Sequence, residues 1–225
     1  MYEFLTGPML ILSLCVFFVG LAARAIWYVR GLNWQLDRVA YGTYPGPGLK
    51  GAVRSVGSWL LPFGTYGWRA QPFMTVAFFL LHLGAVLVPL FLLGHTLILQ
   101  AAIGVSLPSL PGVLADILSW AALVGLAMLT LRRIALPEVR ILTSGQDYLI
   151  LALSAAPFVT GLLARHHVGD YSLVLVLHIL CGELLLILAP FTKLAHIVLF
   201  FMSRAQIGMD YGIKRGGING KGMAW

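Results

Sequence analysis

The chain has 225 residues, of which 60% are hydrophobic and only 10% are charged, and its formal net charge is +7. Its mean hydropathy of +0.91 lies outside the range in which a water-soluble domain covers its surface with polar groups. The composition therefore predicts an integral membrane protein. The positive charge indicates membrane topology and attraction to anionic lipid, and it does not indicate nucleic-acid binding.

Five stretches are long and apolar enough to cross a bilayer, which takes about 20 helical residues. They lie near 5–29, 72–99, 113–135, 147–165 and 172–202. Only helices fit these lengths, so we predict an all-α bundle of five transmembrane helices in a single membrane domain, residues 1–225, without internal repeats. The first stretch lacks the basic region and cleavage site of a secretory signal, and we expect it to stay as a spanning helix. The second and fifth exceed the bilayer thickness, which implies tilt or extension beyond the lipid.

Basic residues gather in alternate connections of the predicted bundle. They lie in loop 30–71, in the connection between spans three and four, and in tail 203–225: Arg30, Arg38, Lys50, Arg54 and Arg69, then Arg132, Arg133 and Arg140, then Arg204, Lys214, Arg215 and Lys221. The connection between spans two and three has no basic residue, and that between four and five has only Arg165. By the positive-inside rule, the N-terminus is predicted outside and the C-terminus in the cytoplasm.

The long loop 30–71 contains a Gly/Pro-rich stretch, TYPGPGLKG, and a more regular one, GLNWQLDRV. We expect a short interfacial helix there, with Trp27, Trp34, Trp59 and Trp68 near the lipid headgroups, and a surface open to a cytoplasmic partner. The C-terminal GMDYGIKRGGINGKGMAW has too many glycines to form a helix alone, so it is expected to be disordered or ordered by another subunit.

Cys15 and Cys181 are separated by 166 residues and belong to no CxxC or CxxCH motif. We expect both to be small buried packing residues.

Four of the six histidines lie within the predicted spans, His82 and His95 in the second and His178 and His196 in the fifth. On a continuous helix, His178 and His196 are about five whole turns and about 27 Å apart, on the same face. His82 and His95 are about 20 Å apart and match less well in direction, although a kink at Pro89 can reorient them. Because the two spans run in opposite directions, His95 is predicted level with His178, and His82 level with His196.

Two such pairs, one near each membrane surface, are the arrangement that holds two haems between two helices, with one histidine from each helix on each iron. Structural zinc needs four ligands around one ion, which these separated pairs do not supply. The alternative is a set of unrelated polar residues along a transport or proton path. A transporter normally shows internal repeats or broken helices, and no repeat is visible.

Small and rigid residues near these histidines fit the haem hypothesis. Gly84, Gly94 and Gly182 would leave room for a flat macrocycle, although membrane helices also use glycine for ordinary packing. Pro190 predicts a kink above Lys193, whose side chain either reaches the cytoplasmic interface or approaches a propionate of the inner haem. His166 and His167 are expected to be solvated loop residues, with contact to an outer propionate or a cytochrome partner as the alternative.

Several motifs resemble a known family. They are HxxxG from His178 to Gly182, PFTKLAH from Pro190 to His196, HLG at His82, GH at Gly94–His95, and LRRIALPEVRILTSGQDYLIL from Leu131 to Leu151. Together they resemble the membrane cytochrome b (gamma) subunit of respiratory nitrate reductase and its relatives in redox complexes of sulfate-reducing bacteria. The likeness is closest to the cytochrome b-like membrane subunit of the high-molecular-weight cytochrome c complex, and it covers spans two to five.

This resemblance implies a multi-pass protein of the bacterial inner membrane that binds two haem b groups through bis-histidine ligation. His95 and His178 would ligate the outer haem iron, and His82 and His196 the inner one. The implied partners are a periplasmic multihaem cytochrome c, other membrane subunits and a cytoplasmic iron–sulfur subunit.

Iron with two axial histidines has no open position for a substrate, so the expected role is electron transfer, with no catalytic residue and no turnover by the chain alone. In one version the chain connects the periplasmic cytochrome to the iron–sulfur subunit. In the other it reacts with menaquinone, and Asp116, Glu183 and Asp170 are the candidate proton carriers. For Glu183, a hydrogen bond to a haem ligand or a neighbouring helix is an equal alternative. A haemless structural anchor of such a complex is the remaining interpretation.

Overall fold

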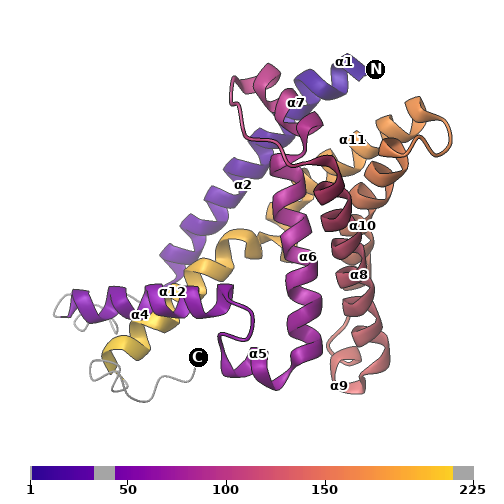
Figure 1. Cartoon of the computed structure of the whole chain (residues 1–225). Helices are drawn as coiled ribbons and strands as arrows, with labels where there is room; N and C mark the ends of the chain where they lie inside the picture. The colour runs from indigo at the N-terminus through magenta and orange to yellow at the C-terminus, as the bar shows by residue number, and fades with distance from the viewer. Residues whose placement is uncertain (1, 33–43, 215–225) are drawn as a thin grey trace. The chain divides into compact units, whose positions relative to one another are not determined.

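The computed structural model describes residues 2–32 and 44–214, and within these ranges the chain is helical and has no strand (Figure 1). Five helices are long and apolar enough to cross a membrane: Tyr2–Gly31, Pro72–Phe91, Gly112–Ala135, Gly145–Arg165 and Tyr171–Phe191. The predicted fold class, an all-α membrane protein with five spanning helices, is thus confirmed. Predictions about Trp34, Arg38, Arg215 and Lys221 concern positions outside the described residues.

The chain forms two compact units, which are described separately. The first comprises Met1–Phe17 and Val76–Ala189, and the second comprises Phe18–Thr75 and Pro190–Trp225. Two helices, α2 (Leu10–Gly31) and α6 (Pro72–Phe91), contribute residues to both.

The first unit holds most of the spanning helices. After α1 (Tyr2–Phe4) and the π-helical turn η1 (Leu5–Met9) come α6, α7 (Leu93–Ile103), α8 (Gly112–Ala135), α9 (Pro137–Arg140), α10 (Gly145–Arg165) and α11 (Tyr171–Leu188). Helix α10 packs against both α8 and α11, and η1 packs against α7 and α11. This arrangement places α10 directly beside the helix that carries His178.

Helices α6 and α8 approach through small residues. A Cβ atom on Gly84 would overlap the Leu118 carbonyl, and one on Gly125 would lie 2.7 Å from the Ala77 carbonyl oxygen. Close backbone approach of this kind is a common way for membrane helices to associate, because lipid tails leave no hydrophobic force to drive association. Gly84 therefore serves helix packing, and the expectation that it makes room for a macrocycle is wrong.

The second predicted span is interrupted. Helix α6 ends at Phe91, Leu92 is extended with ψ 131°, and α7 begins at Leu93. The expected continuous helix over 72–99 is therefore wrong, and His82 and His95 lie on different helices. The chain leaves the helix beside Pro89, which has no backbone N–H to donate. The freed Phe91 carbonyl accepts a hydrogen bond from the Leu110 N–H at 2.7 Å.

The fifth span is interrupted at Pro190, where a kink was predicted. Helix α11 is followed by two 3-10 turns, Ala189–Phe191 and Lys193–Ala195, with Thr192 extended between them, and α12 then runs His196–Lys214. The expected continuous helix over 172–202 is wrong, so the argument that His178 and His196 share one face does not apply. Pro190 is buried, and Gly20 makes room for it, since a Cβ atom there would lie 2.6 Å from the proline Cβ.

The second unit is built around two glycine-rich helices, α4 (Pro45–Leu60) and α12, which pack along each other. A Cβ atom on Gly51 would overlap the Gly208 carbonyl, and one on Gly212 would lie 2.6 Å from the Pro47 carbonyl oxygen. Each helix thus offers a flat face to the other, as in small-residue motifs of membrane helices. The tail as far as Lys214 is ordered by α4 of the same chain, so the expectation of disorder or of ordering by another subunit is wrong for this part.

The interfacial helix predicted over GLNWQLDRV falls mostly on positions outside the described residues. The structure has α4 and the short α5 (Tyr66–Ala70) further along the loop. Trp27 is 65% exposed, as expected for a headgroup position, but Trp68 is only 6% exposed. Its indole N–H donates to the Trp59 carbonyl oxygen at 3.1 Å, and the two rings pack edge to face at 5.0 Å. Trp68 is therefore a core residue of this unit.

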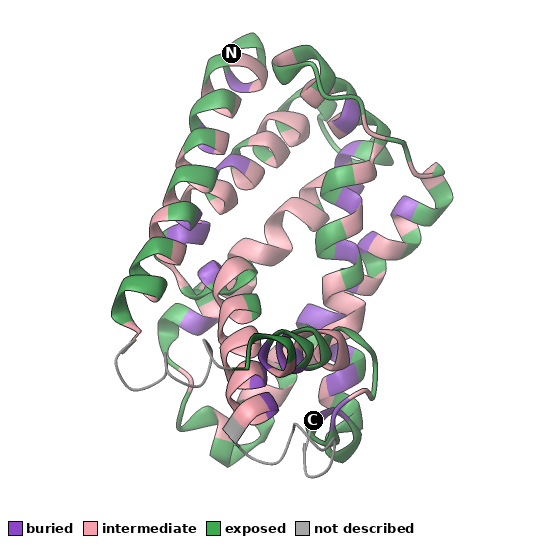
Figure 2. Ribbon diagram, turned by 90° about the vertical axis from the view of Figure 1, so that its left-hand side faces the viewer, coloured by how far each residue is buried: buried purple, intermediate pink, exposed green. Residues whose placement is uncertain are grey.

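Long exposed stretches follow the spanning helices, as Figure 2 shows. Their residues are apolar, for example Val19, Val113 and Leu149, and this is the surface that lipid covers in a membrane protein. Both cysteines are free thiols. Cys15 is exposed and Cys181 half-buried, so the expectation that both are buried is wrong.

Candidate functional site

His95 of α7 and His178 of α11 face each other within the first unit. Their Nε2 atoms are 3.5 Å apart, and their ring planes differ by only 8°. The ring centroids are 5.8 Å apart, which exceeds the Nε2–Nε2 distance by about the width of one imidazole ring. The two rings therefore meet tip to tip in nearly parallel planes, and they do not stack face to face.

Helix α10 positions the imidazole of His178. The Nδ1–H group donates to the Pro157 carbonyl oxygen at 3.0 Å and lies 3.3 Å from the Thr160 hydroxyl. Gly161 provides the space, since a Cβ atom there would lie 2.9 Å from Cε1 of the ring. One turn of α10 thus determines both the direction of this side chain and its tautomer.

The helix interruption at Leu92 positions His95. Its Nδ1–H group donates to the Pro89 carbonyl oxygen at 3.2 Å. The last carbonyls of a helix have no partner within the helix, so the end of α6 supplies an acceptor that a continuous helix would not. The predicted kink near Pro89 is thus a complete break, and the break supplies the contact that orients the ligand candidate.

These hydrogen bonds leave a lone pair on Nε2 of each neutral imidazole. The two lone pairs then point at each other at 3.5 Å, which is unfavourable unless a metal ion or a proton lies between them. Metal-binding histidines almost always donate their other N–H to a carbonyl or carboxylate, as both do here. The pair therefore has the protonation pattern of two metal ligands.

The pair also fits the dimensions of an axially ligated metal. Metal–imidazole bonds are about 2.0–2.1 Å long in zinc sites, so two in line need about 4 Å, slightly more than the observed distance. No group of three or more His, Cys, Asp or Glu side chains arranged for a metal occurs among the described residues. A site with two protein ligands suits a haem, because the macrocycle supplies the other four nitrogens, and it does not suit structural zinc.

His82 and His196 belong to different units, and each is described alone. The Nδ1–H of His82 donates to the Phe78 carbonyl oxygen at 2.8 Å, and its ring stacks on the Phe78 ring at 3.8 Å. The Nδ1–H of His196 donates to the Lys193 carbonyl oxygen at 2.9 Å. Both therefore share the protonation pattern of the first pair, with the lone pair on Nε2. Lys193 itself is exposed.

The glycines adjoining the first pair differ from Gly84. A Cβ atom on Gly94 or Gly182 would meet nothing within 4 Å. Open space beside His95 and on the helix turn after His178 is what the haem hypothesis requires of these two positions.

The two loop histidines have other surroundings. His166 and His167 are exposed, and His167 adopts a left-handed conformation with φ 52° and packs on Tyr171 at 5.0 Å. His166 lies 3.9 Å from the Asp116 carboxylate. Their exposure agrees with the expectation of solvated loop residues.

The three candidate proton carriers have different environments. Asp116 forms an ion pair with Arg165, and Asp170 caps α11 by accepting from the Leu173 N–H at 3.1 Å. Glu183 is only 3% exposed, and neither carboxyl oxygen has a hydrogen-bond partner among the described residues. Asp116 and Asp170 thus have structural roles, and Glu183 is the candidate for which the described residues show no such role.

Sequence reasoning missed Pro157, Thr160 and Gly161, which hold His178 in place. The available signal was the segment PFVTG, in which a proline inside a helix has a threonine three positions later and a glycine four positions later. Nothing in the sequence alone showed that this turn would lie opposite His178.

Fold and site together define a multi-pass, all-α membrane protein with a pair of histidines facing each other between two helices. The chain is 68% identical over 217 residues to a protein of Nitratidesulfovibrio vulgaris (strain Hildenborough), and the alignment covers 96% of each chain. It belongs to the same family as that protein. No protein-family model matches the chain, and no solved structure matches it.

Proposed function

We propose that the chain is a di-haem b membrane subunit of a respiratory redox complex in a bacterial inner membrane, related to the gamma subunit of respiratory nitrate reductase. It carries electrons across the membrane between a periplasmic multihaem cytochrome c and cytoplasmic iron–sulfur subunits, the menaquinone pool, or both. The observation that carries this proposal is the tip-to-tip pair of His95 and His178, with both Nδ1–H groups donating to carbonyls.

Each haem would supply a one-electron iron centre. The protein's part is to hold the ligands and to keep water away. His95 and His178 are fixed by the hydrogen bonds that they donate to carbonyl oxygens of α6 and α10, so neither ring needs to reorient when a metal binds. The surrounding spans are apolar, which keeps the site in a medium of low dielectric constant.

His82 and His196 are proposed as the ligands of the second haem, at the cytoplasmic side. Their support is the shared hydrogen-bonding pattern, in which each Nδ1–H is held by a carbonyl three or four residues earlier. The same pattern at all four ligand candidates, and its absence at the two exposed loop histidines, separates these candidates from ordinary histidines within the described residues.

Menaquinone chemistry is a second candidate function, favoured by Glu183. A quinone that exchanges electrons with a haem also exchanges protons, which requires a group near the site that can carry them. A carboxyl group buried without a partner is costly to keep ionised and is by default a candidate functional residue within a membrane. Glu183 lies five residues after His178 on α11, and it is the one of the three candidates without a structural role in the described chain.

The decisive experiment measures haem content in the purified chain and in four single variants, His82→Ala, His95→Ala, His178→Ala and His196→Ala. A pyridine haemochrome assay with reduced-minus-oxidised spectra is expected to give two b haems for the unaltered chain. His95→Ala and His178→Ala should lose one spectral component, and His82→Ala and His196→Ala the other. His167→Ala is the matched control and should keep both haems.

Absence of haem from a folded, membrane-inserted sample, assembled with its partner subunits, would refute the proposal. The chain would then be a structural anchor of its complex. Loss of the same component in all four variants would refute the pairing while leaving haem binding in place.

A further inference from the structure

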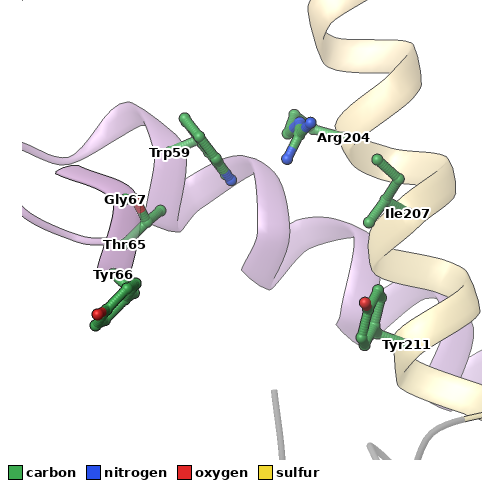
Figure 3. A pocket seen from close by; sticks show the side chains of 7 residues that line it. All are labelled: Trp59, Thr65, Tyr66, Gly67, Arg204, Ile207 and Tyr211. Atoms are coloured by element: carbon green, nitrogen blue, oxygen red, sulfur yellow. The ribbon is translucent and has the colours of Figure 1, made fainter. Parts of the chain in front are cut away.

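A cavity of about 240 Å³ lies in the second unit, between α12 and the segment that joins α4 to α5 (Figure 3). Three of its lining residues, Arg204, Ile207 and Tyr211, follow one face of α12. The opposite side is formed by Trp59, Thr65, Tyr66 and Gly67. The volume is below the roughly 300–1,000 Å³ of pockets that enclose drug-sized ligands, so it suits a small polar group of a larger molecule.

Arg204 is held in a defined orientation at this cavity. Its guanidinium carbon lies 4.7 Å from the centre of the Trp59 ring. Trp59 is itself fixed by Phe200 at 6.3 Å and by Trp68, whose indole donates to the Trp59 carbonyl. A stacked guanidinium keeps its N–H groups at its edge, where they can bind phosphate oxygens in a bidentate manner.

The lining contains no acidic side chain to neutralise Arg204. Among the described residues of this unit, the only acid is Asp210, against cations that include Arg24, Arg30, Lys50, Arg54, Arg69, Lys193 and Arg204. Thr65 caps α5 and is buried, whereas the phenol of Tyr66 is exposed at the rim. The cavity therefore combines a fixed cation, phenol groups and a positive surrounding field, which together attract an anion.

The position along the chain places this cavity at a membrane surface. Tyr66 and Gly67 come a few residues before the second span begins at Pro72, and Arg204 follows the fifth span, which ends at Phe191. In a chain of five crossings, the start of the second and the end of the fifth lie on the same side. The α4 helix, which leads into the cavity, also exposes Leu49, Val53 and Leu60, as a helix resting in lipid does.

We propose that this cavity binds the headgroup of an anionic glycerophospholipid. The phosphate lies against the guanidinium of Arg204, the hydroxyls of a headgroup such as that of phosphatidylglycerol lie near the phenols of Tyr66 and Tyr211, and the acyl chains extend into the bilayer. Basic pockets at the cytoplasmic ends of membrane helices bind such headgroups in general. The proposal does not depend on haem binding.

The test uses the purified full-length chain in a neutral detergent. Native mass spectrometry would measure the retention of dioleoylphosphatidylglycerol, with dioleoylphosphatidylcholine and sodium phosphate as separate arms. We expect retention of the anionic lipid only, and Arg204→Gln should weaken it by roughly tenfold or more, because a charge-assisted hydrogen bond is lost. Arg69→Gln is the matched control, since Arg69 is an exposed arginine of the same unit outside the cavity lining, and it should retain the lipid.

Thermal unfolding of the same samples shows whether each variant is folded. If Arg204→Gln does not unfold cooperatively, Arg204→Lys takes its place, because it keeps the charge but not the planar group, and it should still weaken retention severalfold. Three outcomes would overturn the proposal. The two lipids could be retained equally, or the Arg204 and Arg69 variants could lose the anionic lipid equally. Alternatively, sodium phosphate could stabilise the chain against thermal unfolding as much as the anionic lipid does.

Discussion

The imidazole of His178 owes its orientation to a single turn of a neighbouring helix. The imidazole donates to the Pro157 carbonyl and lies beside the Thr160 hydroxyl, and it fits against Gly161 because this residue has no side chain. Such supporting residues typically change metal affinity by about 10–100-fold when they are altered. The properties of the proposed outer haem site thus depend on α10, which carries no ligand.

Gly161→Ala is therefore expected to disturb the outer site without touching a ligand. The new Cβ atom would lie 2.9 Å from Cε1 of His178, so the ring must shift. We expect about tenfold weaker retention of the outer haem, or a shift of its redox potential, measured by optical redox titration. Gly145→Ala, on the same helix but with no atom within 4 Å of the new Cβ, should behave like the unaltered chain.

Glu183 allows the two versions of the proposed function to be separated. If menaquinol reacts at the site, Glu183→Gln should slow haem reduction by a menaquinol analogue by about 10²-fold, because a proton carrier is lost. Reduction by dithionite should be unchanged, which shows that the haems are intact. Asp170→Asn is the control, because asparagine caps a helix as well as aspartate does. Equal rates in both variants and the unaltered chain would favour the version without quinone.

The contact between α4 and α12 is the main helix pairing of the second unit, and it depends on glycine. Gly51→Ala would place a methyl group into the Gly208 carbonyl, a backbone atom that cannot rotate away. We expect the variant to be destabilised by about 1–3 kcal/mol, seen as a lower temperature of unfolding by tryptophan fluorescence. Gly57→Ala on the same helix meets no neighbour and should be neutral or stabilising by up to about 1 kcal/mol. Similar behaviour of the two variants would contradict this packing.

The spanning helices were predictable because length and hydropathy alone define them. Pro89 and Pro190 predicted kinks near the two interruptions, but the complete breaks could not be predicted, since only Leu92 and Thr192 leave the helical conformation and apolar residues continue on both sides. The tail was mistaken for an isolated segment because Gly208 and Gly212 were judged as helix breakers, whereas their partners Gly51 and Pro47 lie far away in sequence. The four histidines could be singled out by type and position. The carbonyls that orient His178 and His95 could not, because they depend on how helices pack and where one ends.

At the scale of the whole molecule, the basic residues of the connections predict how the chain is oriented in the membrane. The connections after the first and third spans, and the tail, carry most of the arginines and lysines, so these are expected in the cytoplasm. Green fluorescent protein fused after Trp225 should fluoresce in living cells, and alkaline phosphatase inserted at Val168 should be active. The controls exchange the two reporters: alkaline phosphatase fused after Trp225 and green fluorescent protein inserted at Val168 should both be inactive. The opposite pattern would reverse the assignment of the two haems to the membrane faces.

The pairing of α4 with α12 also has a consequence for biogenesis. The second unit joins residues 18–75 to residues from 190 onward, and all residues between these two stretches belong to the first unit. During synthesis, the glycine face of α4 therefore stays uncovered until α12 has left the ribosome. A nascent chain truncated before α12 would expose this face to proteases and chaperones, so the second unit completes its folding only after α12 has been synthesised.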